Sequence, residues 1–358
     1  MSEEMARAVR IQRSGAWYHI TSRGNERRPI YRDEVDRRHF CQLLAGAVER
    51  YRLLLHAYVL MENHYHLLME TLEANLSRAM QWVNVSYSTW FNRRHRRCGH
   101  LFQGRYQAIV VDRLGWGLEV SRYVHLNPVR VERLGLGKEA RQLDRLGIGS
   151  RPDAAQVRDR IGQLRRYRYS SYRAYAGLEK APDWLTCQSV LELMGSGSLS
   201  KQRQAYRQHV ESAVRQGVME SPWEKVIAQV MLGRVAFVEE LRRQVRGNER
   251  EQPSLKGLKP RPSLQTIVGV VEGLKGETWE QFRDRYGDNG RDLVLWLGRK
   301  RGGFGLRELG QLAGGLDYTS VSLAVKRFEK RRDRVKSLRE MSHRAEQALI
   351  TQMSNVEM

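Results

Sequence analysis

Two histidines stand two residues apart in the stretch from 55 to 70, LHAYVLMENHYHLLME. The apolar runs of this stretch predict extended structure, in which side chains at i and i+2 point to the same face. His64 and His66 would therefore project together and could supply half of a divalent metal site. The alternative is a pair of structural histidines on a half-buried strand, and the pair alone does not decide between the two.

A tyrosine and an asparagine in the stretch RYVHLNPVR have the spacing of one helical face. Tyr123 and Asn127 are four residues apart, so they would lie side by side on a helix that Pro128 ends or kinks. An amide oxygen can complete a metal site begun by two histidines, and a phenol beside it can act as a nucleophile. This spacing is more often found in surface or packing residues, but the histidine pair and the basic composition favour a functional role.

The charge of the chain favours a polyanionic partner. Among the 358 residues, 62 Lys and Arg outnumber 40 Asp and Glu, giving a net charge of +22 and a pI near 10.3. Nucleic acid is the default partner for such a chain. There is no run of 18 apolar residues and no signal peptide at the start, which disfavours a membrane and predicts a cytoplasmic protein. The cysteines at 41, 98 and 187 form no CxxC motif, so a disulfide framework and a thiolate zinc site are not supported.

The segments that would position these groups predict an α+β domain. Strands are predicted at 17–23, 55–61, 64–69 and 100–111, with a hairpin turn at 62–63. Helices are predicted at 32–51, 75–94 and 118–131. This order favours a small antiparallel sheet with helices packed on it.

The rest of the chain predicts further domains. We expect a catalytic domain at 1–135, an insertion and helical extension at 136–200, a helical connector at 201–247, a proline-containing linker at 248–263, and an all-α DNA-binding domain at 264–358. Within the connector, 222–244 is predicted to be one helix.

Four motifs in order, YHITSRGN, NHYHLL, HLFQGRYQA and RYVHLNPVR, resemble the HUH single-tyrosine transposases, in particular the REP-associated tyrosine transposases of bacteria. The resemblance covers roughly 17–135, with a further match at YRYSSYRAYAG. It implies a ferredoxin-like HUH fold and an endonuclease that nicks and transfers single-stranded DNA carrying imperfect-palindrome hairpins. Two departures are visible: Glu62 replaces an expected proline, and the segment 137–166 lengthens the gap before the YSSY element.

The resemblance also assigns roles. It implies that His64, His66 and Asn127 bind a metal ion and that Tyr123 attacks the scissile phosphate to form a 5′-phosphotyrosine link. Imidazole ligands alone would suit zinc or another transition metal, whereas an amide oxygen and phosphate suit Mg²⁺ or Mn²⁺. The resemblance favours Mg²⁺ or Mn²⁺.

Basic and aromatic residues near these motifs are candidate DNA contacts. They are Arg23, Asn25, Arg27, Arg28, Arg93, Arg94, Arg96, Arg97, Arg105 and Tyr106. For each arginine the alternative is a solvated cationic face. Arg105 and Tyr106 could either hold the neighbouring strand or stack on a base.

The C-terminal region predicts a helix-turn-helix. Helices at 306–312 and 318–331 are separated by Gly314-Gly315, and the second ends in KRFEKRR. The stretch GGLDYTSVSLAVKRF is similar to the DNA-binding domain at the end of the bacterial chromosomal replication initiator. That resemblance implies that Tyr318, Thr319, Ser320 and Lys326 approach duplex DNA. A helical bundle with a basic outer face is the alternative.

Two other functions compete with the transposase hypothesis. A domesticated, non-catalytic DNA-binding protein would keep the fold and the charge, but would not need all four of His64, His66, Tyr123 and Asn127. A rolling-circle replication initiator would share the chemistry, although a closely spaced tyrosine pair is absent from the helix. We expect a monomer, with a dimer as the alternative.

Overall fold

The computed structural model describes residues 11–134, 136–137, 152–216, 221–227, 229–244 and 261–355. The chain divides into two compact units, 1–258 and 259–358. Each unit has its own cluster of buried apolar side chains.

The first unit is built on a five-stranded sheet with the strand order β2-β3-β1-β4-β5. The strands are β1 (Ala16–Arg23), β2 (Leu53–Leu60), β3 (His64–Thr71), β4 (Gln107–Val111) and β5 (Met231–Leu232). The first four pair antiparallel, while β5 runs parallel to β4. The predicted α+β class and antiparallel sheet are therefore confirmed, with one added parallel strand.

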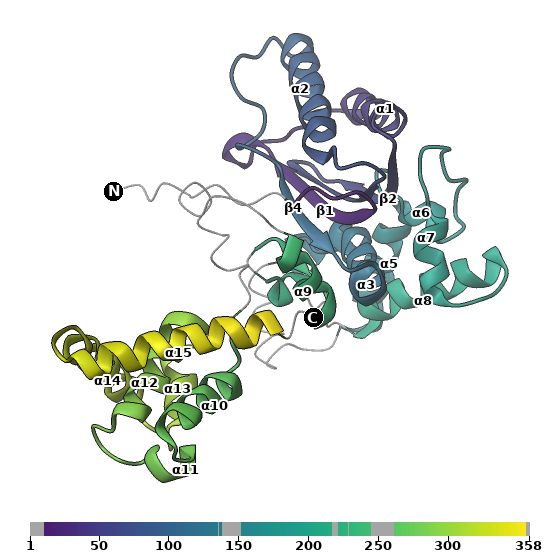
Figure 1. Ribbon diagram of the computed structural model, residues 1–358. Helices are drawn as coiled ribbons and strands as arrows, with labels where there is room; N and C mark the ends of the chain where they lie inside the picture. The colour runs from purple at the N-terminus through teal and green to yellow at the C-terminus, as the bar shows by residue number, and fades with distance from the viewer. Residues whose placement is uncertain are drawn as a thin grey trace. The chain divides into compact units, whose positions relative to one another are not determined.

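The two faces of the sheet differ in chemistry. Helices α1 (Glu34–Arg50) and α2 (Leu76–Arg94) cover one face, where Phe40 and Tyr65 pack in a buried aromatic cluster (Figure 1). Helix α3 (Arg113–Leu126) crosses the other face, onto which every second residue of β1 and β3 points. A Cβ at Gly117 would lie 3.1 Å from the Trp17 ring, so a glycine here lets α3 approach β1 closely.

Two predicted elements near the site have different bounds in the structure. The strand predicted at 100–111 contains only β4, because the chain turns at Gly104, which has a φ of +69°, and Phe102 pairs instead with Gly24. Helix α3 begins at Arg113 and ends at Leu126, and a 3₁₀ turn, Asn127–Val129, follows it. Pro128 lies in that turn, which accounts for the end of the α-helix.

A helical extension packs against α3. It comprises α5 (Ala154–Arg166), α6 (Tyr172–Tyr175), α7 (Gln188–Leu191) and α8 (Leu199–Gln216). Part of the predicted insertion, 138–151, lies outside the described residues.

A buried polar network connects α3 to this extension. The His125 ring lies 2.6 Å from the Tyr206 hydroxyl through Nδ1 and 2.7 Å from Ser171 Oγ through Nε2. The Tyr206 hydroxyl donates in turn to Ser121 Oγ at 3.0 Å. Burial lowers the pKa of His125 to about 3, so the ring is neutral at pH 7. The network fixes the C-terminal half of α3 through Ser121 and His125.

Removing one hydroxyl from this network should destabilise the first unit. We expect Tyr206→Phe to lower the free energy of unfolding by about 1–3 kcal/mol, because it leaves the buried Nδ1 of His125 without its partner and removes the bond to Ser121. Urea denaturation followed by circular dichroism measures this change. Tyr51→Phe makes the same chemical change at a half-buried position outside the network and should cost less than about 0.5 kcal/mol. Equal losses in the two variants would contradict the expectation.

The single helix predicted at 222–244 is wrong. The structure has a 3₁₀ turn (Pro222–Lys225), then β5, then α9 (Val235–Gln244). Val230, Met231 and Leu232 are consecutive and all buried, a pattern of a short strand covered on both sides rather than of an amphipathic helix. The Asp112 carboxylate pairs with the Arg234 guanidinium through two contacts, of 2.6 and 3.1 Å, which holds this segment at the end of β4.

All regular secondary structure in the described residues of the second unit is helical, as predicted. It contains α10 (Leu264–Lys275), α11 (Trp279–Phe282), α12 (Asn289–Leu297), a π-helical turn (Gly298–Gly302), α13 (Leu306–Leu312), α14 (Tyr318–Arg334) and α15 (Lys336–Asn355). Most of the predicted linker, 248–260, lies outside the described residues. In the described parts of both units, none of the helices has the length and apolar character needed to cross a membrane.

Candidate active site

The histidine pair lies on the α3 side of the sheet. In the register of β1 and β3, His64 is opposite Arg23 and His66 is opposite Thr21. The two imidazoles meet edge to face, with 5.0 Å between ring centroids. The predicted strand therefore presents both rings to one surface.

Helix α3 brings Tyr123 to this pair. The Tyr123 ring lies edge-on to the His66 imidazole at 5.7 Å between centroids. One turn further on, the Asn127 amide nitrogen donates to the Tyr123 carbonyl at 2.8 Å, which directs the amide oxygen away from the helix backbone. Asn127 is only 7% exposed. His64, His66 and Tyr123 are thus linked by ring contacts, and Asn127 follows on the same helix.

A third histidine, which the sequence analysis did not single out, orients the pair. His19 lies on β1, and its Nε2 is 2.9 Å from Nδ1 of His66. If His66 Nδ1–H donates this bond, Nε2 of His66 keeps its lone pair. His19 then carries a proton on Nδ1, which is buried without a partner among the described residues, at a cost of about 1–3 kcal/mol.

The His64 ring is oriented in a similar way. Its Nδ1 lies 2.7 Å from the Asn63 side-chain oxygen, and the Asn63 amide nitrogen donates to the Arg27 carbonyl at 2.8 Å. The Asn63 oxygen must therefore accept from His64 Nδ1–H, which again leaves Nε2 with its lone pair.

Burial keeps these imidazoles neutral. It lowers the pKa of His64 to about 4, assisted by the Arg23 charge, and the pKa of His19 to about 3. It also holds the pKa of His66 well below its usual range, with a further contribution from His19. Neutral imidazoles with a defined lone pair are the form that binds metal ions.

A metal ion here would need an oxygen ligand besides the histidines. Among the described residues there is no group of three or more His, Cys, Asp or Glu side chains that could hold a metal ion. The Asn127 amide oxygen is the donor that the sequence analysis named, and its type fits a hard divalent ion. The donor set of two neutral imidazoles and one amide therefore fits a divalent ion that completes its coordination with phosphate oxygens or water.

Two further side chains contact Tyr123, and the sequence analysis gave neither a role. The Arg130 guanidinium lies over the Tyr123 ring at 4.3 Å from the centroid. The Trp223 ring meets Tyr123 edge to face at 4.8 Å and stacks on His19 at 4.2 Å. Arg130 is the last residue of the motif RYVHLNPVR, so its position was visible in the sequence. Trp223 has no such signal.

The predicted DNA contacts near the histidines have mixed environments. Arg23, Arg27, Arg28, Arg93, Arg96 and Arg105 are exposed, and Asn25 and Arg97 are half-buried. Arg23 is opposite His64 in the register of β1 and β3. Of these predicted contacts, it is therefore the arginine that the register places beside the candidate site. Arg97 bonds to the His100 carbonyl and the Asn92 side chain within its own loop.

Two of the predicted contacts have partners within the first unit. Arg94 pairs with Asp33 at 2.7 Å and with Asp36 at 2.5 Å, so its charge joins α2 to the start of α1. Tyr106 is 7% exposed and its hydroxyl lies 3.2 Å from Ser77 Oγ. The stacking alternative for Tyr106 is therefore wrong, because its ring is in the core; the alternative of holding the strand agrees with this position.

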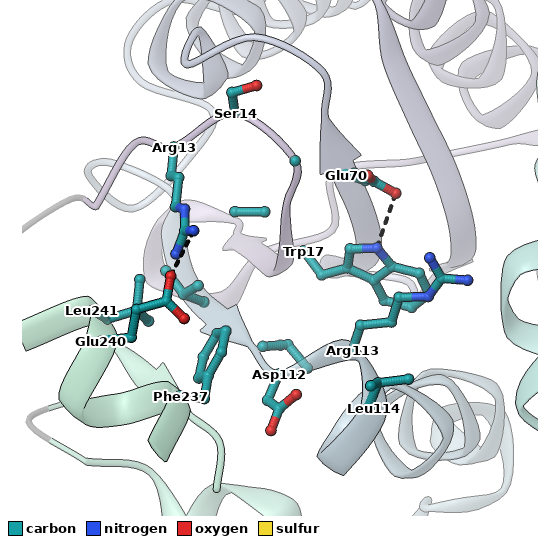
Figure 2. Close-up of a pocket in the computed structure, with 14 residues that line it drawn as sticks. Arg13, Ser14, Trp17, Glu70, Asp112, Arg113, Leu114, Phe237, Glu240 and Leu241 are labelled. Atoms are coloured by element: carbon teal, nitrogen blue, oxygen red, sulfur yellow. Dashed lines mark hydrogen bonds and ion pairs between the residues drawn. The ribbon is translucent and has the colours of Figure 1, made fainter. Parts of the chain in front are cut away.

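A polar pocket of about 230 Å³ lies at the other end of β1, where α9 meets the sheet. Figure 2 shows two interactions among its lining side chains: Arg13 pairs with Glu240, at 2.7 Å, and the Trp17 indole donates to Glu70, at 2.9 Å. Phe237 and Leu241 of α9 line the same pocket. These contacts attach α9 to the sheet and give the pocket a structural role.

Part of the chain is similar to known transposases. Residues 12–127 match the family model described as "Transposase IS200 like". A search of curated proteins finds no match. Among solved structures, the chain resembles one titled "Structure of the REP associates tyrosine transposase bound to a REP hairpin", with 14% identity and a TM-score of 0.34, over 56% of this chain and 93% of that one.

The family match spans β1 to the end of α3 and includes every residue of the candidate catalytic and metal set. Its members are transposases, a class of enzymes that cleave DNA. Residues 12–127 are therefore similar to the IS200-like transposase family.

Proposed function

We propose that the first unit is a metal-dependent, single-stranded DNA endonuclease and strand transferase that acts on REP-like repeat hairpins. The observation that carries this proposal is the edge-on contact of Tyr123 with His66, at 5.7 Å between ring centroids, within one chain. A nucleophile beside two oriented, neutral imidazoles has the composition of a phosphoryl-transfer site. Because one chain supplies all of these residues, the proposal is consistent with a monomer.

Each protein group has a defined task in the reaction. The Tyr123 oxygen attacks the scissile phosphorus, the bond to the 3′-oxygen breaks, and the chain retains the 5′-phosphate on tyrosine. The phenol loses a proton as it attacks, and the leaving 3′-oxygen gains one, so the number of protons is unchanged. The Arg130 guanidinium over the Tyr123 ring favours the charge that develops on the phenol oxygen and on the phosphate.

The metal has three proposed ligands in this chain. His64 and His66 would bind it through Nε2, and Asn127 through its amide oxygen. When bound, Mg²⁺ or Mn²⁺ supplies charge neutralisation and orientation of the scissile phosphate. The hydrogen bonds that His66 Nδ1–H donates to His19 and His64 Nδ1–H donates to Asn63 would hold the two imidazoles in the required tautomer before the ion arrives.

End-labelled hairpins test the proposal. Wild-type protein is incubated with a single-stranded repeat hairpin and Mg²⁺ or Mn²⁺, then separated on a denaturing gel. A 5′-phosphotyrosine link requires that a 3′-label migrates with the protein and that a 5′-label is released on a shorter strand. If no repeat hairpin gives a labelled protein with either ion, the enzymatic proposal fails and a non-catalytic DNA-binding role is favoured.

We propose that the second unit binds duplex DNA through α13 and α14. Asp317 caps α14 by accepting from the Thr319 and Ser320 amides at 2.8 and 3.0 Å, which fixes the start of the helix. Tyr318 is 60% exposed at that start, and Lys326 is exposed two turns later. Ser320 is half-buried, and its hydroxyl donates to Asp317, so its side chain is less available for DNA.

Removing the second unit should separate the two DNA activities. Deleting the chain from Pro253 onward should weaken binding to duplex DNA by at least about 10-fold, because a set of phosphate contacts is lost. Nicking of a short hairpin should change less than about threefold, since the first unit has its own core. Fluorescence anisotropy with duplex and hairpin probes measures both.

A point substitution serves as the matched test. Lys326→Ala should reduce the slope of log affinity against log salt by about one, as expected for one lost phosphate contact. Lys336→Ala, at the exposed start of α15, is the control and should leave the slope unchanged. Full duplex affinity after the deletion would contradict the assignment.

A further inference from the structure

The segment that completes the sheet also reaches the nucleophile. The docked segment, residues 221–227 and 229–244, lies outside the family match and carries Trp223. Trp223 is half-buried and meets Tyr123 edge to face at 4.8 Å, with 81° between the ring planes. Its ring stacks on His19 at 4.2 Å with 26° between planes. The indole thus contacts the candidate nucleophile and the histidine that orients His66.

The contacts that hold the docked segment are independent of the active site. In β5, Met231 and Leu232 pair with Val110 and Val111 of β4 and are fully buried. Arg234 pairs with Asp112 at 2.6 Å. At the start of the segment, the Lys225 ammonium lies 5.3 Å from the Trp116 ring of α3. Lys225 therefore attaches the segment near its start, and β5 and Arg234 attach it further along. Trp223 lies between α3 and β1.

The direction of these contacts limits how Tyr123 can move. His66 meets the Tyr123 ring edge-on, Arg130 lies over it, and Trp223 meets it from a third element. Edge-to-face aromatic contacts of this geometry are favourable, and together they favour one position of the Tyr123 ring. Reaction rates depend steeply on such positions, because a displacement of about 1 Å can cost about 100-fold.

We infer that Trp223 is a positioning residue for the Tyr123 nucleophile, and that the docked segment is part of the catalytic unit. This inference rests on the proposed function. Trp223 acts through Tyr123 and His19 and takes no part in bond making, so it affects the rate of cleavage on bound DNA rather than the binding of DNA.

Single-turnover cleavage of the labelled hairpin by the full-length protein tests this inference. Trp223→Ala should lower the rate constant at saturating protein by about 10- to 100-fold, since the Tyr123 ring loses one of the contacts that hold its position. The dissociation constant for uncleaved hairpin should change less than about threefold. Trp223→Phe keeps an aromatic edge against Tyr123 and should recover most of the rate.

Trp82→Ala is the matched control. It removes a half-buried indole of the same size from α2, which covers the face of the sheet opposite α3 and the docked segment. Its rate constant should stay within about threefold of wild type. An unchanged rate in Trp223→Ala, an equal loss in Trp82→Ala, or a loss explained by weaker DNA binding would each overturn the inference while leaving the proposed function intact. A wild-type protein that forms no adduct would overturn both.

Discussion

Replacing the Tyr123 hydroxyl should abolish covalent chemistry without loss of DNA binding. We expect Tyr123→Phe to form no adduct with a 3′-labelled hairpin and to cleave at least about 10³-fold more slowly than wild type, because no other group replaces the attacking oxygen. The phenyl ring keeps its edge contacts with His66 and Trp223 and its position under Arg130. The measurement is the rate of adduct formation in single-turnover conditions, together with hairpin affinity by anisotropy.

The control for this prediction is a tyrosine of another helix. Tyr318→Phe removes an exposed hydroxyl in the second unit and should leave hairpin cleavage within about twofold of wild type. If Tyr123→Phe still forms the adduct, a different residue is the nucleophile. If it loses both cleavage and hairpin binding, the substitution has disturbed the fold, and the thermal midpoint will distinguish this outcome.

The parts of the site that the sequence predicted are those with local periodicity. The spacing of His64 and His66 indicates a shared face only if the segment is a strand, and β3 is one. The i and i+4 spacing of Tyr123 and Asn127 needs a helix, which α3 supplies up to Leu126. These patterns depend on neighbours within one element, and such patterns can be seen in a sequence.

The residues that the sequence did not predict depend on pairing between distant segments. His19 was within a quoted motif, but its bond to His66 follows from the register of β1 against β3. Trp223 reaches Tyr123 because β5, a strand of only two residues, attaches its segment to β4. A strand of two residues is too short to show an alternation of apolar and polar side chains. Because the amphipathic helix α9 follows it, the pattern of the whole segment suggests one long helix.

The net charge of the chain does not indicate which arginines could contact DNA. Arg94 is in a basic run, yet the structure pairs it with Asp33 and Asp36 and so assigns it to the contact between α1 and α2. Arg23, in contrast, lies opposite His64 and is exposed. Composition predicted the class of partner, but side-chain pairing decides which arginines remain available to it.

Removing a proposed metal ligand should change the metal dependence of cleavage as well as its rate. We expect His66→Ala to lower the cleavage rate at millimolar metal by on the order of 10²-fold or more. The metal concentration that gives the half-maximal rate should also rise by at least about 10-fold. His19→Ala removes only the hydrogen bond that orients His66, so its half-maximal concentration should rise by about 10- to 100-fold with a smaller loss of rate at saturating metal.

The two histidine variants together distinguish a metal ligand from a proton acceptor. A ligand role predicts that excess metal recovers much of the rate in His19→Ala and little of it in His66→Ala, because only the first retains both proposed imidazole ligands. His343→Ala, an exposed histidine of α15, is the control and should match wild type in both quantities. If His66→Ala is slow but has the metal dependence of wild type, His66 acts on a proton and the ion is bound elsewhere. In that case the hydrogen bond between His66 and His19 would set the basicity of His66. His19→Ala would then also keep the metal dependence of wild type.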